Sequence, residues 1–178
     1  MIKLCHHVKT RSLQTLTYCI FWSDCLYIFL VMGMQMGMII NETLRLYSPA
    51  LNLARKTARE VRLGDMIVPA GMELNIMLIA AHHDPMIWGE DVYLFKPERF
   101  AEGASKATNN NVTAFLPFGW GPRMCVGLNF AINEAKIALS MILQSYRFTL
   151  SPNYVHSPIL NIGLSPQHGL HIILHPLC

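Results

Sequence analysis

One short run of the sequence combines a reactive side chain with the backbone freedom to bring another molecule close to it. The run extends from Phe118 to Gly127 and holds Cys125 together with three glycines and a proline. Glycine and proline favour a tight loop, and glycine leaves room for a flat group to approach the backbone. A cysteine in this setting is either a buried structural thiol or a ligand, and its neighbours must decide between the two.

The neighbours of Cys125 favour a charged sulfur beside a carboxylate-bearing ligand. Arg123 carries a planar fork of N–H donors that suits a carboxylate. A helix is expected after Gly127, because apolar residues recur there at helical spacing. Its free N–H groups and positive end would stabilise a nearby thiolate. The recurring residues are Phe130, Ala131, Ala135, Ala138, Met141 and Ile142.

Three further features lie upstream of this run. Glu42 and Arg45 are three residues apart, which places both side chains on one helical face, able to share an ion pair. Such a pair, taken alone, is most often solvated. The segment Pro97-Glu98-Arg99-Phe100 adds another arginine, and Arg55 follows Arg45 by ten residues.

In this order, the patterns resemble the cytochrome P450 family. Phe118 to Gly127 fills every fixed position of that family's haem-binding signature, Phe-x-x-Gly-x-Arg-x-Cys-x-Gly. Glu42-Thr43-Leu44-Arg45 is similar to the family's Glu-x-x-Arg helix, and Pro97-Glu98-Arg99-Phe100 to its Pro-Glu-Arg-Phe segment. The ordered combination is far more specific than any one of these short patterns.

The resemblance extends from about Met38 to the end of the chain. Sequence segments such as His82-His83-Asp84-Pro85 resemble those of the plant clan that includes secologanin synthase and brassinosteroid-inactivating hydroxylases. One departure stands at Ser48, where these relatives usually have a first proline before Pro49. That departure touches none of the cofactor contacts that the resemblance implies.

The resemblance implies roles for eight residues. Cys125 would be the axial thiolate ligand of the iron of haem b, and Arg123 and Arg55 would bind the haem propionates. Phe118 would pack near the sulfur, with Gly127 beside the cofactor. A buried structural triad would hold the scaffold behind the haem, and its members are Glu42, Arg45 and Arg99.

The implied activity is that of a haem-thiolate monooxygenase. It would hydroxylate a small apolar molecule with O2 and electrons from NADPH, delivered by NADPH-cytochrome P450 reductase. Family members of this kind sit on the cytoplasmic face of the endoplasmic reticulum membrane. The family's distal helix, with its acidic residue and threonine, has no counterpart between Met1 and Met36. We therefore expect a truncated P450 fold, its C-terminal part only, and a catalytically inactive remnant is the alternative.

Composition excludes several other classes. Hydrophobic residues make up 52% of the 178 residues and charged residues 14%, so an ordered core is expected rather than disorder. The net charge of +3 is too small to indicate nucleic-acid binding. Five cysteines without framework spacing argue against a disulfide scaffold and favour a reducing compartment. They are Cys5, Cys19, Cys25, Cys125 and Cys178.

The elements predicted to position these residues are mainly helical, with a small antiparallel sheet. A helix around Glu42 should end at Pro49, and Asp84 should cap a short helix that starts at Pro85. No periodicity is visible over 95–119. Strands are expected over 56–63, 66–68 and 73–80 and in the tail after Phe148, with turns at 64–65 and 165–169.

Residues 1–36 form an atypical apolar leader, which we separate from the haem-binding region over 37–178. A basic start precedes the apolar stretch, so membrane association and a buried or poorly folded leader both remain open. A zinc cluster of Cys5, His6 and His7 with Cys19 or Cys25 is disfavoured, because no pair has Cys-x-x-Cys spacing.

Overall fold

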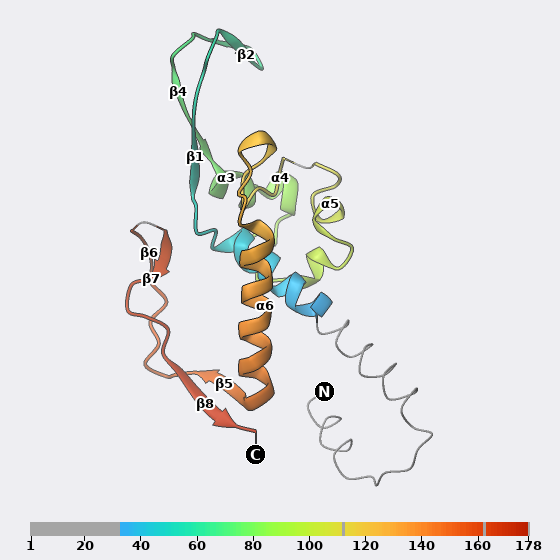
Figure 1. Ribbon diagram of the computed structural model, residues 1–178, viewed down its shortest axis with the longest axis vertical. Coiled ribbons are helices and arrows are strands. Elements are labelled where there is room, and N and C mark those ends of the chain that lie inside the picture. The colour runs from blue at the N-terminus through green and yellow to red at the C-terminus, as the bar shows by residue number, and fades with distance from the viewer. Residues whose placement is uncertain (1–32, 112, 162, 178) are drawn as a thin grey trace. The chain divides into compact units, whose positions relative to one another are not determined.

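The helix that carries Glu42 and Arg45 ends where the sequence predicts. It covers residues 33–46 and stops before Ser48 and Pro49, because proline has no N–H to donate and disfavours helical backbone at the residue before it. The computed structural model describes residues 33–111, 113–161 and 163–177 (Figure 1). The chain divides into two units after Met34, and all eight expected site residues belong to the second.

The leader expected over 1–36 lies outside the described residues as far as residue 32, as do all members of the disfavoured zinc cluster. Residues 33–36 are helical, so the helix runs across the boundary drawn at residue 36. In the part of the chain that is described, no helix has both the length and the apolar character needed to cross a membrane. The same described part holds no group of three or more His, Cys, Asp or Glu side chains arranged to bind a metal ion.

The described strands form two-stranded antiparallel sheets. The pairs are β1 (Asn52–Lys56) with β4 (Glu73–Met77), β2 (Val61–Leu63) with β3 (Met66–Val68), β5 (Tyr146–Leu150) with β8 (Ile172–Pro176), and β6 (Pro158–Leu160) with β7 (Leu164–Pro166). The turn at 64–65 is confirmed. The turn expected over 165–169 is shorter, because β7 includes Ser165 and Pro166 and only Gln167 and His168 turn.

Two expected strands were wrong in their extent. The strand predicted over 56–63 contains only Lys56, the last residue of β1, and the separate strand β2. Between them the Thr57 hydroxyl donates to the Pro69 carbonyl at 2.7 Å and accepts from the Met72 N–H at 3.0 Å, and these bonds mark the corner at the end of β1. The strand predicted over 73–80 ends at Met77, because the Leu- and Ala-rich residues after it form helix α3 (Leu78–His82).

Four of the other described helices have only three or four residues: α4 (Pro85–Trp88), η2 (Pro97–Phe100), α5 (Ala104–Ala107) and η3 (Gly121–Arg123). Helix α6 (Leu128–Ser145) is 18 residues long. The Asp84 cap is confirmed, since its carboxylate accepts from the Met86 N–H at 2.9 Å with proline at the first helical position. The region read as irregular over 95–119 contains η2 and α5. Helices and small antiparallel sheets are therefore more evenly mixed than the expectation of a mainly helical class implies.

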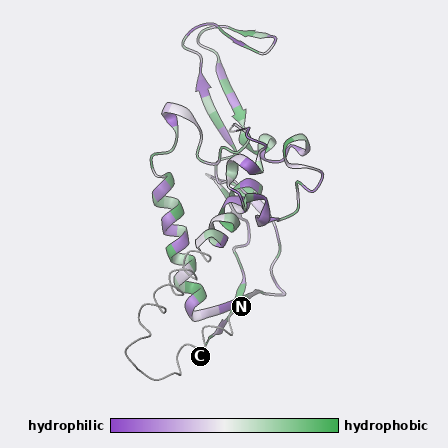
Figure 2. Ribbon diagram, turned by 90° about the vertical axis from the view of Figure 1, so that its right-hand side faces the viewer, coloured by the Kyte–Doolittle hydropathy of each residue, from purple (hydrophilic) through white to green (hydrophobic). Residues whose placement is uncertain are grey.

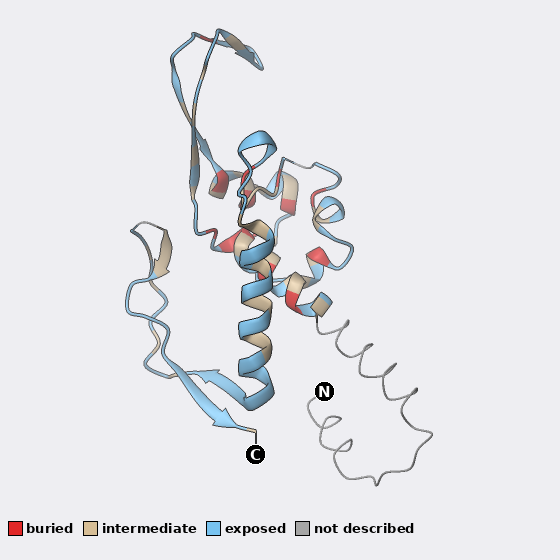
Figure 3. Cartoon of the chain, in the orientation of Figure 1, coloured by how far each residue is buried: buried red, intermediate tan, exposed pale blue. Residues whose placement is uncertain are grey.

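Burial is concentrated around the short helices rather than along the long one. Trp88, Val92 and Phe100 form an apolar cluster, and the ring of Phe115 lies 4.9 Å from that of Phe100. Figure 3 shows buried residues on the helix over 33–46, α3, α4 and η2, whereas α6 has none. Along α6 apolar and polar residues alternate, as Figure 2 shows, and apolar side chains such as Phe130 are exposed.

A buried arginine connects the helix over 33–46 to the segments around it. Arg45 is fully buried, and its Nε and Nη2 atoms donate to the two carboxylate oxygens of Glu42 at 2.8 and 2.9 Å. Its Nη1 atom donates to the His82 carbonyl at 2.9 Å, and Nη2 also reaches the Leu94 carbonyl at 3.5 Å. The guanidinium carbon lies 5.1 Å from the ring centroid of Trp88.

Arg99 joins the same carboxylate from η2. Its Nε atom lies 3.5 Å from Glu42 Oε1, which also accepts the Lys96 N–H at 2.9 Å. The Arg99 Nη1 atom donates to the Trp88 carbonyl at 2.7 Å, and Nη2 donates to the Asp91 carbonyl at 2.6 Å. Hydrogen bonds from Lys96 and Arg99 lower the pKa of Asp91 to about 2. The Glu42 carboxylate thus pairs with Arg45 and Arg99 and accepts the backbone N–H of Lys96.

Glu42→Gln is expected to destabilise the chain strongly. The substitution keeps the shape of the side chain but leaves the buried Arg45 guanidinium without its counter-charge, which typically costs about 3–5 kcal/mol. Urea unfolding followed by circular dichroism measures the loss. Glu98→Gln makes the same chemical change at an exposed carboxylate and should stay within about 0.5 kcal/mol of wild type. Equal effects of the two substitutions would contradict a central role for the buried pair.

Candidate functional site

The loop over 118–127 is closed by its own backbone. Gly119 and Gly121 both have φ near +75°, a conformation that glycine adopts without strain, and η3 begins at the second of them. The Cys125 N–H donates to the Phe118 carbonyl at 2.9 Å, and the Met124 N–H donates to the Gly121 carbonyl at 3.0 Å. These bonds fold the loop back on itself and leave the Cys125 side chain exposed.

Helix α6 starts immediately after this loop. Gly127 is its N-terminal cap, and the carbonyl of Cys125 accepts the Leu128 N–H at 3.4 Å. The helix is 18 residues long, so the partial positive charge at its N-terminus is well developed. Cys125 lies two residues before the cap, at this N-terminal end of the helix.

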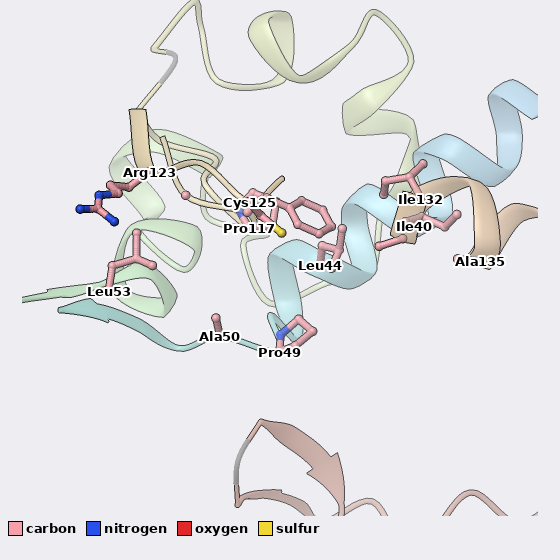
Figure 4. Close-up of a pocket in the computed structure, with 13 residues that line it drawn as sticks. Ile40, Leu44, Pro49, Ala50, Leu53, Pro117, Arg123, Cys125, Ile132 and Ala135 are labelled. Carbon is pink, nitrogen blue, oxygen red and sulfur yellow. The ribbon is translucent and has the colours of Figure 1, made fainter. Parts of the chain in front are cut away.

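Beside the loop lies an apolar cavity of about 490 Å³, within the size range of small-molecule and cofactor sites. The helix over 33–46, the segment leading into β1, the loop and α6 all contribute walls (Figure 4). In that view the sulfur of Cys125 lies between Arg123 on one side and Ile132 and Ala135 on the other. The lining residues are Ile40, Leu44, Pro49, Ala50, Leu53, Pro117, Phe118, Gly119, Arg123, Cys125, Ala131, Ile132 and Ala135.

The side chains around this cavity suit a large apolar group that carries a metal and a carboxylate. One thiol and one guanidinium line walls that are otherwise apolar side chains and glycine backbone. Small residues keep the space beside the sulfur open. A Cβ at Gly127 would lie 3.8 Å from the Cys125 sulfur, and a Cβ at Gly121 would meet no atom within 4 Å. Haem, with its central iron and two propionates, fits this combination.

The structure brings four of the five expected cofactor residues together. Cys125, Arg123 and Phe118 line the cavity, and Gly127 lies directly beside the sulfur. Arg55 is not among the lining residues. It lies on β1 two residues beyond Leu53, which does line the cavity, and its Nη1 atom donates to the Ala54 carbonyl at 2.8 Å.

Glu42, Arg45 and Arg99 come together as described above, but none of them lines the cavity. Leu44, between the first two, does. On the helix over 33–46, Glu42 and Arg45 are therefore buried in the protein, whereas Ile40 and Leu44 face the cavity.

Sequence reasoning missed most of the apolar wall. Ile40 and Leu44 are four residues apart and so share a helical face, which is a signal that could have identified them. Pro49, Ala50 and Leu53 follow the end of that helix and carry no local pattern, because their place at the cavity depends on how the chain turns into β1.

Comparison with known proteins identifies related sequences. A family model of cytochrome P450 matches residues 35–173. The chain is 59% identical over 141 residues to the cytochrome P450 CYP749A22 of Panax ginseng. It is 53% identical over 140 residues to the 7-deoxyloganic acid hydroxylase of Catharanthus roseus and 51% identical to the 11-oxo-beta-amyrin 30-oxidase of Glycyrrhiza uralensis.

Each of these matches covers 79% of the chain and 27% of the relative. The chain therefore spans about a quarter of the length of the relatives it matches. The matched residues contain the closed loop, the cavity and the buried ion pairs. On this similarity, the chain belongs to the cytochrome P450 family.

Proposed function

We propose that this chain provides the haem-binding region of a haem-thiolate monooxygenase, with Cys125 as the axial ligand of haem b. The observation that carries the proposal is the exposed Cys125 sulfur at an apolar cavity, between Arg123 and the start of α6. When bound, the haem supplies the oxygen chemistry, and a thiolate ligand pushes electron density onto its iron, as in cytochromes P450 generally.

The residues of the chain would position and insulate that group. The positive end of α6 would moderate the charge on the Cys125 sulfur, and the guanidinium of Arg123 would pair with a propionate. Phe118 and the apolar wall from Ile40 to Leu53 would exclude water from the sulfur side. Glu42, Arg45 and Arg99 would hold the helix that forms this wall.

We extend the proposal to the reaction. A small apolar substrate would be hydroxylated with O2, using electrons from NADPH that a cytochrome P450 reductase delivers. The names of two relatives, a hydroxylase and an oxidase, support the reaction class. Association with the endoplasmic reticulum membrane belongs to the same proposal and rests on the family alone. Residues 37–178 would be the haem-binding region.

Cys125→Ala should abolish the thiolate-type Soret band in the reduced carbon-monoxide difference spectrum of the chain supplied with haem. Among the described residues, Cys125 is the only one with a sulfur atom that lines the cavity, so alanine would leave no thiolate there to bind the iron. Met124→Leu alters an exposed neighbouring sulfur in the same loop and should leave the band in place. A band that persists in Cys125→Ala would refute the assignment of the ligand.

Arg123→Leu should weaken haem binding by about 10- to 100-fold, the effect of losing one hydrogen bond between charged groups. Arg55→Leu should have a clearly smaller effect, because Arg55 donates to its own chain instead of lining the cavity. Fluorescence titration of each variant with haem measures both affinities. A larger loss in Arg55→Leu would contradict the side-chain arrangement seen here and favour the role that family resemblance assigns to Arg55.

A further inference from the structure

A buried histidine connects the ion pair to the loop that carries Cys125. His82 ends α3, and its side chain is completely buried. Its carbonyl accepts the hydrogen bond from Arg45 Nη1 at 2.9 Å, while its ring Nε2 atom accepts the N–H of Leu116 at 3.0 Å. One residue thus contacts both the charged centre and the segment that leads into the cysteine loop.

The contact with Leu116 fixes the protonation state of the ring. Because Nε2 accepts a hydrogen bond, the neutral ring must carry its proton on Nδ1, which has no partner among the described residues. Burial, together with the nearby His83 and Arg45, lowers the pKa of His82 to about 4. The ring is therefore neutral at pH 7 and available as an acceptor.

Few hydrogen bonds separate this ring from the cysteine. The Leu116 carbonyl accepts the Gly119 N–H at 3.0 Å, and the Phe118 carbonyl accepts the Cys125 N–H at 2.9 Å. The ring of Phe115 also packs against that of His82, with centroids 5.4 Å apart. The backbone from 115 to 119 is thus held at one end by His82 and at the other by Cys125.

We propose that His82 is a positioning residue for Cys125, holding the loop through the N–H of Leu116 so that the sulfur faces the cavity. This inference rests on the proposed function, because it assigns His82 to the thiolate ligand of that site. It goes beyond the residues that the family signature contains, since His82 lies 43 positions before Cys125 and is not among the residues that line the cavity.

Protonation would reverse the contact, because a protonated Nε2 would place an N–H against the N–H of Leu116. The charged groups near the His82 ring disfavour its protonated form. Arg45, from the helix over 33–46, and His83, on the same turn, both oppose a further positive charge. The nearest carboxylate partner of this centre, Glu42, is already paired with Arg45 and Arg99.

Two substitutions separate positioning from simple space-filling. His82→Gln keeps an acceptor where Nε2 lies, whereas His82→Leu removes it and leaves the partly buried Leu116 N–H without this partner. Hydrogen exchange of the full chain without haem should be about 10-fold or more faster at Leu116 and Gly119 in His82→Leu, and close to wild type in His82→Gln. The alkylation rate of Cys125, followed by mass spectrometry, should change in His82→Leu alone.

His168→Leu, at an exposed turn, is the matched surface control. With haem supplied, the thiolate-type share of the carbon-monoxide spectrum should fall in His82→Leu and recover in His82→Gln. Exchange and alkylation that are the same in wild type and His82→Leu would overturn the proposal. Altered exchange and alkylation, with no thiolate band even in wild type, would instead count against the proposed function and leave the link from His82 to the loop standing.

A pH measurement keeps the proposal testable if His82→Leu does not fold. The pKa of His82 rises from about 4 to its ordinary 6.5 on unfolding, so the unfolded chain binds the proton more readily. The stability that the neutral ring contributes is complete above pH 6.5 and is lost as the pH falls towards 4. Between pH 7 and pH 5 the folding equilibrium constant should fall on the order of 10-fold more in wild type than in His82→Gln. Identical pH dependence would contradict a neutral, accepting His82.

Discussion

The described fold depends on one buried guanidinium. Arg45 has no contact with solvent, so each of its donors must find a partner inside the protein. Glu42 supplies the counter-charge, and the carbonyl groups of His82 and Leu94 accept from Nη1 and Nη2. Because His82 and Leu94 lie 37 and 49 residues from Arg45 in sequence, satisfying one side chain fixes where α3 and the chain before η2 can lie.

The cysteine loop follows from the same constraint. The residue whose carbonyl is held by Arg45, His82, also holds the N–H of Leu116 through its ring. From there backbone hydrogen bonds close the loop on Cys125. The opposite side of the helix over 33–46 supplies the apolar wall that the sulfur faces. Charged centre, loop and cavity are therefore parts of one arrangement.

Local chemistry in the sequence was sufficient for the loop, the Asp84 cap, α6 and the spacing of Glu42 and Arg45. It failed where tertiary contacts decide. The Thr57 hydroxyl marks the corner between β1 and β2, and the apolar residues after Met77 continue as a helix, although both stretches read as strands. The propionate-binding role expected for Arg55 stays a prediction, and the residue lies on β1 and is not among those that line the cavity. The contact from His82 to the loop had no local signal in the sequence, because its partner Leu116 lies 34 positions away.

Iron K-edge X-ray absorption of the chain reconstituted with haem tests the central claim most directly, because it reports the atoms bound to the metal. The geometry around Cys125 predicts one sulfur in the coordination shell of the iron, in addition to the nitrogens of the porphyrin. That sulfur should be absent from the Cys125→Ala variant. A shell of nitrogen and oxygen atoms alone in the wild-type chain would contradict the account.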